Sequence, residues 1–273
     1  MSAAVSSIAR RSIVVVFGTR GGMSDVGKFA AFHALQLQSS GQSSGQNNTS
    51  VRVVAMSFGT EDGEDKGFAP EVTDLSSQQT VEECLRREDE SHGITKVDVR
   101  NSEASVQQLE DAFKGADAVI ACVGNRQPSM PRWVSPATQQ IKAAIAKTGV
   151  QRLVQLSSMG IGDDKVKPSV IKVLWWTMLR TMLRSAHADL EEAERIVRTD
   201  PVCDYLLVRP MGLTPSEPPK HSWSVLHTDR GSLGTSIAKS DVAEFMLQEA
   251  LTPTFSRTEV TVGPGTGESA GVN

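Results

Sequence analysis

The chain has 273 residues, a length that suits one large α/β domain or two small ones. Its content of 39% hydrophobic and 22% charged residues is ordinary for a soluble globular protein. The formal net charge of -4 argues against a nucleic-acid surface and against attraction to anionic membranes, so we expect neither as a partner.

The three cysteines, Cys84, Cys122 and Cys203, lie far apart, and none has CxxC spacing. They indicate a reducing compartment and no structural metal, so we expect a cytoplasmic location. We interpret residues 1–11 as a short disordered leader and residues 263–273 as a polar, glycine-rich disordered tail. A single domain is expected between them, over residues 12–262.

The chain is organised around an apolar run at residues 13–17 that leads into a glycine-rich turn at residues 18–22. After the turn, apolar residues recur at helical spacing, namely Val26, Phe29, Phe32 and Leu35. This pattern predicts a buried parallel strand, a tight turn and an amphipathic helix that ends near Gln38. It is typical of the opening of a nucleotide-binding βαβ unit.

Glycine suits this turn because a diphosphate must lie against bare backbone at the start of a helix. A Cβ would block that approach, whereas unpaired amides and the helix dipole attract the anion. The spacing departs from the usual fingerprint, because Gly27 follows Gly21 by about one helical turn more than expected. An ordinary connection between a strand and a helix is the alternative interpretation.

The rest of the chain alternates between strands and helices. Strands are expected at residues 51–56, 94–99, 116–123, 150–157, 205–208, 223–226 and 259–262. Helices are expected at residues 80–87, 102–113, 132–146 and 240–251, and over 167–199 in two pieces broken near 185–187. This order predicts a doubly wound parallel sheet of the Rossmann type, with small C-terminal elements on the substrate side and the ligand over the carboxyl ends of the strands.

The end of the second strand usually decides the type of dinucleotide. An acidic residue there binds the ribose hydroxyls, and an arginine binds a 2′-phosphate. Here the strand leads into Ser57, Phe58 and Gly59, so neither signal is present. The nearest candidate for a phosphate partner is Arg20, although it could equally be a solvated turn residue. We therefore expect NADP as the cofactor, with NAD as the alternative.

Several local patterns occur in an order typical of one family. They are Val15–Gly21 (VVFGTRG), Asp98–Arg100 (DVR), Gly115–Ile120 (GADAVI), Leu153–Gly160 (LVQLSSMG), Val208–Pro210 (VRP) and Ile237–Ala243 (IAKSDVA). Together they make the chain resemble the atypical short-chain dehydrogenase/reductases, in particular the NmrA-like and biliverdin/flavin-reductase-like NAD(P)-binding proteins. The resemblance covers residues 12–262.

The resemblance implies positions for the cofactor. The diphosphate would be surrounded by Gly18, Thr19, Arg20, Gly21, Gly22 and Val26. The adenine would lie against Asp98 and Val99, although Asp98 could only cap a loop. The adenosine ribose and the diphosphate would be lined by Val123, Gly124 and Asn125. The nicotinamide would lie near Ser157, Ser158 and Met159, and be closed over by Arg209, Pro210, Met211 and Gly212.

Catalytic side chains are harder to assign. Ser157 and Ser158 are the candidates, but small hydroxyl residues at the end of a buried strand commonly satisfy backbone groups instead. Arg209 could hold a structural ion pair with Glu194 or Asp189 rather than contact a ligand.

The usual proton relay of this superfamily is absent from the sequence. It requires a tyrosine with a lysine four residues later, whereas the single tyrosine, Tyr205, is followed at that distance by Arg209. Flavins and linear tetrapyrroles can accept hydride while solvent supplies the proton, because the cofactor carries the difficult chemistry. An apolar wall for such an acceptor could come from Trp175, Trp176, Met178 and Met182, which could equally be core residues.

We therefore expect a reductase that uses NADPH on a small-molecule substrate, a planar conjugated acceptor such as a flavin, quinone or tetrapyrrole-like compound. The alternative is a non-catalytic NAD(P)-binding redox sensor or assembly protein that acts through a protein partner. A third interpretation is an isomerase that keeps the fold but has changed its ligand.

Overall fold

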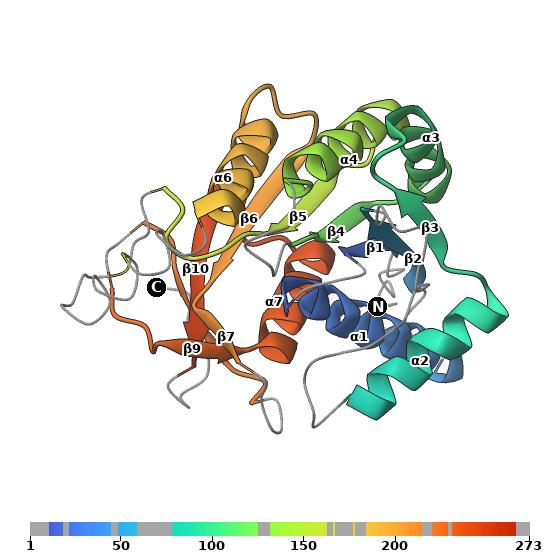
Figure 1. The fold of residues 1–273 in the computed structure, drawn as a ribbon. Coiled ribbons are helices and arrows are strands. Elements are labelled where there is room, and N and C mark those ends of the chain that lie inside the picture. Colours follow the sequence, from blue (N-terminus) through green and yellow to red (C-terminus); the bar gives the residue numbers. More distant parts are fainter. Residues whose placement is uncertain are drawn as a thin grey trace, which may run out of the picture.

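The computed structural model describes residues 11–18, 22–44, 49–58, 78–124, 132–162, 166, 177, 184–214, 220–228 and 231–265. Within these residues the chain forms an eight-stranded sheet with helices on both faces (Figure 1). The predicted doubly wound α/β fold is confirmed. Apart from Arg11, Gly263, Pro264 and Gly265, the expected leader and tail lie outside the described residues.

The sheet has the strand order β3-β2-β1-β4-β5-β6-β10-β8. Its strands are β1 (Arg11–Gly18), β2 (Thr49–Ser57), β3 (Thr95–Asp98), β4 (Ala118–Cys122), β5 (Arg152–Leu156), β6 (Asp204–Pro210), β8 (Trp223–Leu226) and β10 (Thr258–Pro264). All pairs are parallel except β10 with β8. Two short strands that the sequence did not predict, β7 (Gly212–Thr214) and β9 (Ser236–Ala238), pair in parallel beside it.

Helices cover both faces of the sheet (Figure 1). One face carries α1 (Gly22–Ser44), α2 (Gln78–Ser91) and α7 (Lys239–Leu251), and the other carries α3 (Ser102–Phe113), α4 (Val134–Thr148) and α6 (Arg184–Arg198). Each face has its own hydrophobic core: Val15 and Phe17 of β1 belong to one, and Val14 and Val16 to the other. Burial on both faces explains why β1 is an unbroken apolar run.

Two helices differ from the prediction. Helix α1 continues to Ser44 rather than ending near Gln38. Its serines remain compatible with the helix because Ser39 Oγ donates to the carbonyl of Leu35 at 2.9 Å, and Ser40 Oγ donates to that of Leu37 at 3.1 Å. The break expected near residues 185–187 does not fall on them, since they lie within the first turn of α6, which begins at Arg184. Residues 178–183, just before it, lie outside the described residues.

Gly27 brings α1 into close contact with the sheet. A Cβ at this position would lie 2.5 Å from Cβ of Phe17 in β1 and 2.7 Å from Cβ of Cys122 in β4. Gly27 therefore permits the close packing of helix on strand that the third glycine of a dinucleotide fingerprint permits, despite its stretched spacing.

Replacing Gly27 with alanine should destabilise the fold. Alanine favours a helix by about 1 kcal/mol over glycine, so a loss can only come from the new contacts with β1 and β4. We expect a net loss of about 2 kcal/mol in the free energy of unfolding, measured by urea denaturation. Gly149→Ala is the comparison, because a Cβ there would meet nothing within 4 Å but φ is +73°. It should cost only the strain of a left-handed backbone, about 1 kcal/mol. Unchanged stability of Gly27→Ala would show that α1 can move off the sheet without cost.

Candidate functional site

The predicted site residues come together at one edge of the sheet. The strands β1 to β6 run parallel, so their carboxyl ends meet there. The chain goes from β1 outward to β2 and β3, then returns to form β4 on the other side of β1. Open α/β sheets bind their ligands at such a reversal, outside the carboxyl ends of the strands. We call this place, between the ends of β1 and β4, the crevice.

The predicted diphosphate residues lie at the end of β1 and the start of α1. Helix α1 begins at Gly22, so its amino end lies at this edge of the sheet, where helix ends favour an anion. Thr19, Arg20 and Gly21 lie outside the described residues, and their contacts stay predictions. The side chain of Val26 is fully buried in the hydrophobic core, so it supports α1 from below.

Gly18 is required for a reason that sequence analysis did not give. A Cβ there would lie 2.5 Å from Oγ of Ser24 and 2.9 Å from Cη2 of Trp133. Both neighbours are protein atoms from the first turn of α1 and the start of α4. Glycine at the end of β1 thus lets these two side chains close over the strand.

Buried charges support the first turn of α1. Asp25 is 2% exposed, and its carboxylate accepts a hydrogen bond from Lys239 Nζ of α7 at 2.7 Å. Lys28 Nζ lies 3.9 Å from the same carboxylate. The two cations offset a carboxylate that would otherwise oppose an anion at this helix end. Asp25 and Lys239 are 214 residues apart, so no local pattern could have revealed this pair.

The predicted adenine side lies at the end of β3. Asp98 accepts hydrogen bonds from the backbone amide of Arg100 at 3.0 Å and from its Nη2 at 2.7 Å. Asp98 therefore caps the loop after β3, as the alternative interpretation expected, and its side chain is half-exposed. Val99 is fixed through its backbone, because its amide donates to the carbonyl of Ser57 and its carbonyl accepts from Gln140 Nε2 at 2.8 Å.

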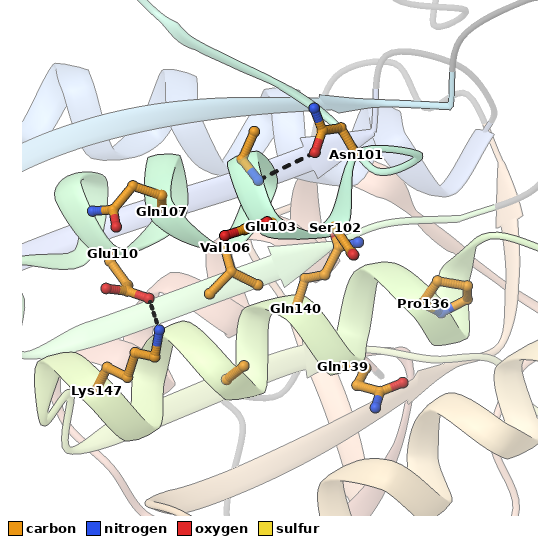
Figure 2. Close-up of a pocket in the computed structure, with 12 residues that line it drawn as sticks. Asn101, Ser102, Glu103, Val106, Gln107, Glu110, Pro136, Gln139, Gln140 and Lys147 are labelled. Atoms are coloured by element: carbon orange, nitrogen blue, oxygen red, sulfur yellow. Dashed lines mark hydrogen bonds and ion pairs between the residues drawn. The ribbon is translucent and has the colours of Figure 1, made fainter.

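Gln140 also lines a groove between α3 and α4 (Figure 2). The groove runs along the two helices from Asn101, whose side chain accepts from the amide of Ala104, to an ion pair between Glu110 and Lys147. Its walls are mostly amides, small apolar side chains and this ion pair. Glu110 and Lys147 are paired with each other, so we assign no chemistry to this groove.

The β4 side of the crevice is built on the start of α4. Val123 and Gly124 follow β4 and are buried, and Asn125 lies outside the described residues. The carboxylate of Asp189 in α6 accepts hydrogen bonds from the amides of Trp133 and Val134 at 2.9 Å and of Ser135 at 3.0 Å. Asp189 therefore caps α4 from another helix, a role that its sequence position does not signal.

The predicted nicotinamide residues follow β5 and β6. Ser157 Oγ donates to Glu194 Oε1 at 2.6 Å, and Arg209 forms a two-pronged ion pair with the same carboxylate at 2.9 and 2.7 Å. All three residues are at most 1% exposed. The ion pair considered for Arg209 is thus present, with Glu194 and not with Asp189. Their contacts with a nicotinamide stay predictions.

The other predicted residues of this side flank that cluster. The amide of Met159 donates to the carbonyl of Pro210 at 3.2 Å, that of Met211 to Val262, and that of Gly212 to Thr235. Ser158 is half-buried, and its hydroxyl donates to the carbonyl of Met159 at 3.3 Å. The proposed acceptor wall, Trp175, Trp176, Met178 and Met182, lies outside the described residues.

Comparison with known proteins agrees with this geometry. A family model described as NAD(P)H-binding matches residues 71–253, which is more than half of the chain. The chain belongs to this NAD(P)H-binding family. A search of curated proteins found no match.

Solved structures share the family's fold. A short-chain dehydrogenase/reductase from Veillonella parvula DSM 2008 in complex with NADP is 16% identical, with a TM-score of 0.58 and coverage of 96% of this chain and 99% of that chain. The anaerobillin reductase ChuY from Escherichia coli O157:H7 is 17% identical, with a TM-score of 0.60 and coverage of 93% and 98%. A proposed NADH-flavin reductase from Streptococcus pneumoniae TIGR4 is 12% identical, with a TM-score of 0.58 and coverage of 93% and 99%. At these identities the likeness shows the fold alone.

The residues described at the crevice are of the kinds that bind a dinucleotide. They are the amino end of α1 with buried cations beneath it, and a buried donor, Nε1 of Trp133, that has no partner among the described residues. No trio of metal-ligating side chains gathers anywhere in the described residues. None of the helices described here is both long and apolar enough to cross a membrane.

Replacing Arg209 with methionine should strongly destabilise the protein, because Glu194 would remain buried without its main cation. We expect a loss of about 3–5 kcal/mol in the free energy of unfolding, measured by urea denaturation. Arg198→Met is the matched control, since Arg198 contacts the same carboxylate at 3.4 Å from a partly exposed position and should cost at most about 1 kcal/mol. Equal, small losses from both substitutions would contradict a structural role for the buried pair.

Proposed function

We propose that the protein is an NADPH-dependent reductase of a planar conjugated acceptor, such as a flavin, quinone or tetrapyrrole-like compound, and that it works without a tyrosine acid. The observation that carries the proposal is the position of Tyr205 in a chain that belongs to an NAD(P)H-binding family. The similarity of the fold to an anaerobillin reductase and to a proposed NADH-flavin reductase supports this acceptor class.

Tyr205 lies far from the crevice. It is the second residue of β6, and the strand reaches the carboxyl edge only at Pro210, five residues later. At about 3.3 Å per residue this places Tyr205 about 17 Å from that edge. Burial raises the pKa of its hydroxyl, and the carboxylate of Glu259 raises it further. A tyrosine at this position is too far from the crevice to act as the acid. This favours a mechanism in which solvent supplies the proton.

When bound, the nicotinamide supplies a hydride, and the acceptor takes up that hydride together with a proton from water. The protein's part is to orient and to exclude competing reactions. In the proposal, the amides at the start of α1 hold the diphosphate, and the backbone after β5 and β6 positions the reactive ring. Ser158, half-buried at this edge, is the hydroxyl best placed to contact the acceptor, while Ser157 is engaged by Glu194.

Reduction of the acceptor should not depend on the tyrosine. Purified protein should consume NADPH when given members of a panel of flavins, quinones and linear tetrapyrroles, followed by absorbance at the nicotinamide band. Tyr205→Phe should leave kcat within about twofold of the unchanged protein, because Tyr205 lies about 17 Å of strand away from the edge. A loss of a hundredfold or more in kcat, which is the usual contribution of a general acid, would show that the tyrosine takes part in the reaction.

Arg20 is proposed to contact the 2′-phosphate. Arg20→Ala should then weaken binding of NADPH by about tenfold or more while changing NADH binding little, since a charge-assisted contact to phosphate is lost. Calorimetric titration with both nucleotides measures this. Arg11→Ala is the control, because Arg11 is an exposed arginine at the opposite end of β1. Equal losses for NADPH and NADH would remove Arg20 from this role.

The second candidate function is a non-catalytic NAD(P)-binding sensor that acts through a protein partner. It is favoured by the absence of a Tyr-x-x-x-Lys pair from the sequence. Nucleotide binding without turnover on any acceptor in the panel would support the sensor over the reductase.

A further inference from the structure

Trp133 lies at the junction of β1, α1 and α4. It immediately precedes α4 and is among the largest fully buried side chains, with 1% exposure. The ring carbons Cη2 and Cζ2 would lie 2.9 and 3.3 Å from a Cβ at Gly18. The indole therefore covers the last residue of β1, on the β4 side of the crevice.

The indole N–H of Trp133 is a donor without an acceptor. Nε1 is buried and has no hydrogen-bond partner in the part of the chain that the structure describes. Nε1 and Cζ2 are both bonded to Cε2, so the N–H belongs to the same ring edge that faces Gly18. A buried donor left unpaired is costly, and such groups are uncommon in folded proteins. An acceptor supplied by a ligand in the crevice would remove that cost.

The backbone amides around Trp133 are already paired. Asp189 accepts from those of Trp133, Val134 and Ser135, and Pro136 has no N–H. The amide of Ala137 already bonds within the helix to the carbonyl of Trp133. The start of α4 consequently offers a ligand no backbone donor from these residues. The indole N–H is the donor that remains on this side of the crevice among them.

We propose that the indole N–H of Trp133 donates a hydrogen bond to an oxygen of the adenosine diphosphate half of the dinucleotide. This inference rests on the proposed dinucleotide binding and adds a binding residue to it. The donor is neutral and lies beside the end of β1, so it does not distinguish a 2′-phosphate from a 2′-hydroxyl. Trp133 therefore contributes affinity for NADPH and NADH alike, whereas Arg20 is proposed to separate them.

The wild-type protein allows a direct test by NMR. The sequence contains four tryptophans, so protein labelled with ¹⁵N-tryptophan should give four indole N–H signals. Addition of NADP⁺ or ADP should move the Trp133 signal to lower field, as a new hydrogen bond requires, and nicotinamide mononucleotide should leave it in place. Trp133→Phe assigns the signal; should that variant not fold, Trp175→Phe, Trp176→Phe and Trp223→Phe assign it by elimination.

Calorimetry on the substituted protein gives the second readout. Trp133→Phe should weaken binding of NADPH, NADH and ADP by the same factor, about tenfold. Trp223→Phe is the matched control, because Trp223 lies in β8 at the far edge of the sheet and should leave all three affinities unchanged.

The two proposals fail differently. Absence of nucleotide binding by the wild-type protein would overturn the dinucleotide site itself. Nucleotide binding with a stationary Trp133 signal would overturn only this inference, because the nucleotide would then not be the acceptor. Affinity losses in Trp133→Phe that differ between NADPH and NADH would also contradict a neutral contact to the shared half of the molecule.

Discussion

The site depends on how closely α1 lies against the sheet. Gly27 allows the helix to touch Phe17 of β1 and Cys122 of β4, the two strands that flank the crevice. A larger side chain would push the amino end of α1 away from the point where the strand order reverses. Ser24 could then no longer reach the end of β1 beside Gly18. The direction of the amides at the start of α1 thus depends on the contacts of Gly27 with Phe17 and Cys122, which lie away from the proposed ligand.

Buried carboxylates hold separate elements of the fold together. Five acidic side chains are buried among the described residues: Asp25, Asp189, Glu194, Asp241 and Glu249. Each is held by a cation or by backbone amides, for example Asp241 by the amides of Lys220 and His221 and Glu249 by Arg152. An acid that must donate or accept a proton during a reaction cannot also hold the fold in this way without loss of stability. These five carboxylates therefore have structural roles in the described part of the chain.

The sequence predicted what is repeated along the chain and missed what depends on distant residues. Uninterrupted apolar runs such as residues 13–17 require burial on both faces, which a parallel sheet between helices provides, so the fold followed from periodicity. The extent of α1 did not, because the serines after Gln38 favour turns locally but bond back to the helix here. Strands β7 and β9 are three residues each, too short for a pattern to predict.

In the candidate site, too, local sequence predicted some features and missed those that depend on distant residues. The positions of Gly18, Asp98 and Ser157 at strand ends could be predicted, because parallel strands bring their carboxyl ends to one edge. The partners could not: Asp189 caps a helix that begins 55 residues earlier, and Glu194 holds Arg209 through the fold. The reason for Gly18 was also different, since Trp133 and Ser24 fill the space beside it. Such contacts depend on the tertiary structure rather than on local sequence.

The C-terminal elements β7, β9 and α7 are linked to helix α1 by a buried ion pair. Strand β7 follows β6 after a single residue and pairs with β9, and β9 leads directly into α7. The first residue of α7, Lys239, donates to Asp25 in the first turn of α1. Helices α1 and α7 also share one hydrophobic core, to which Val26 and Val242 belong. The first turn of α1, where the diphosphate is proposed to bind, is therefore held in place by residues from the C-terminal part of the chain.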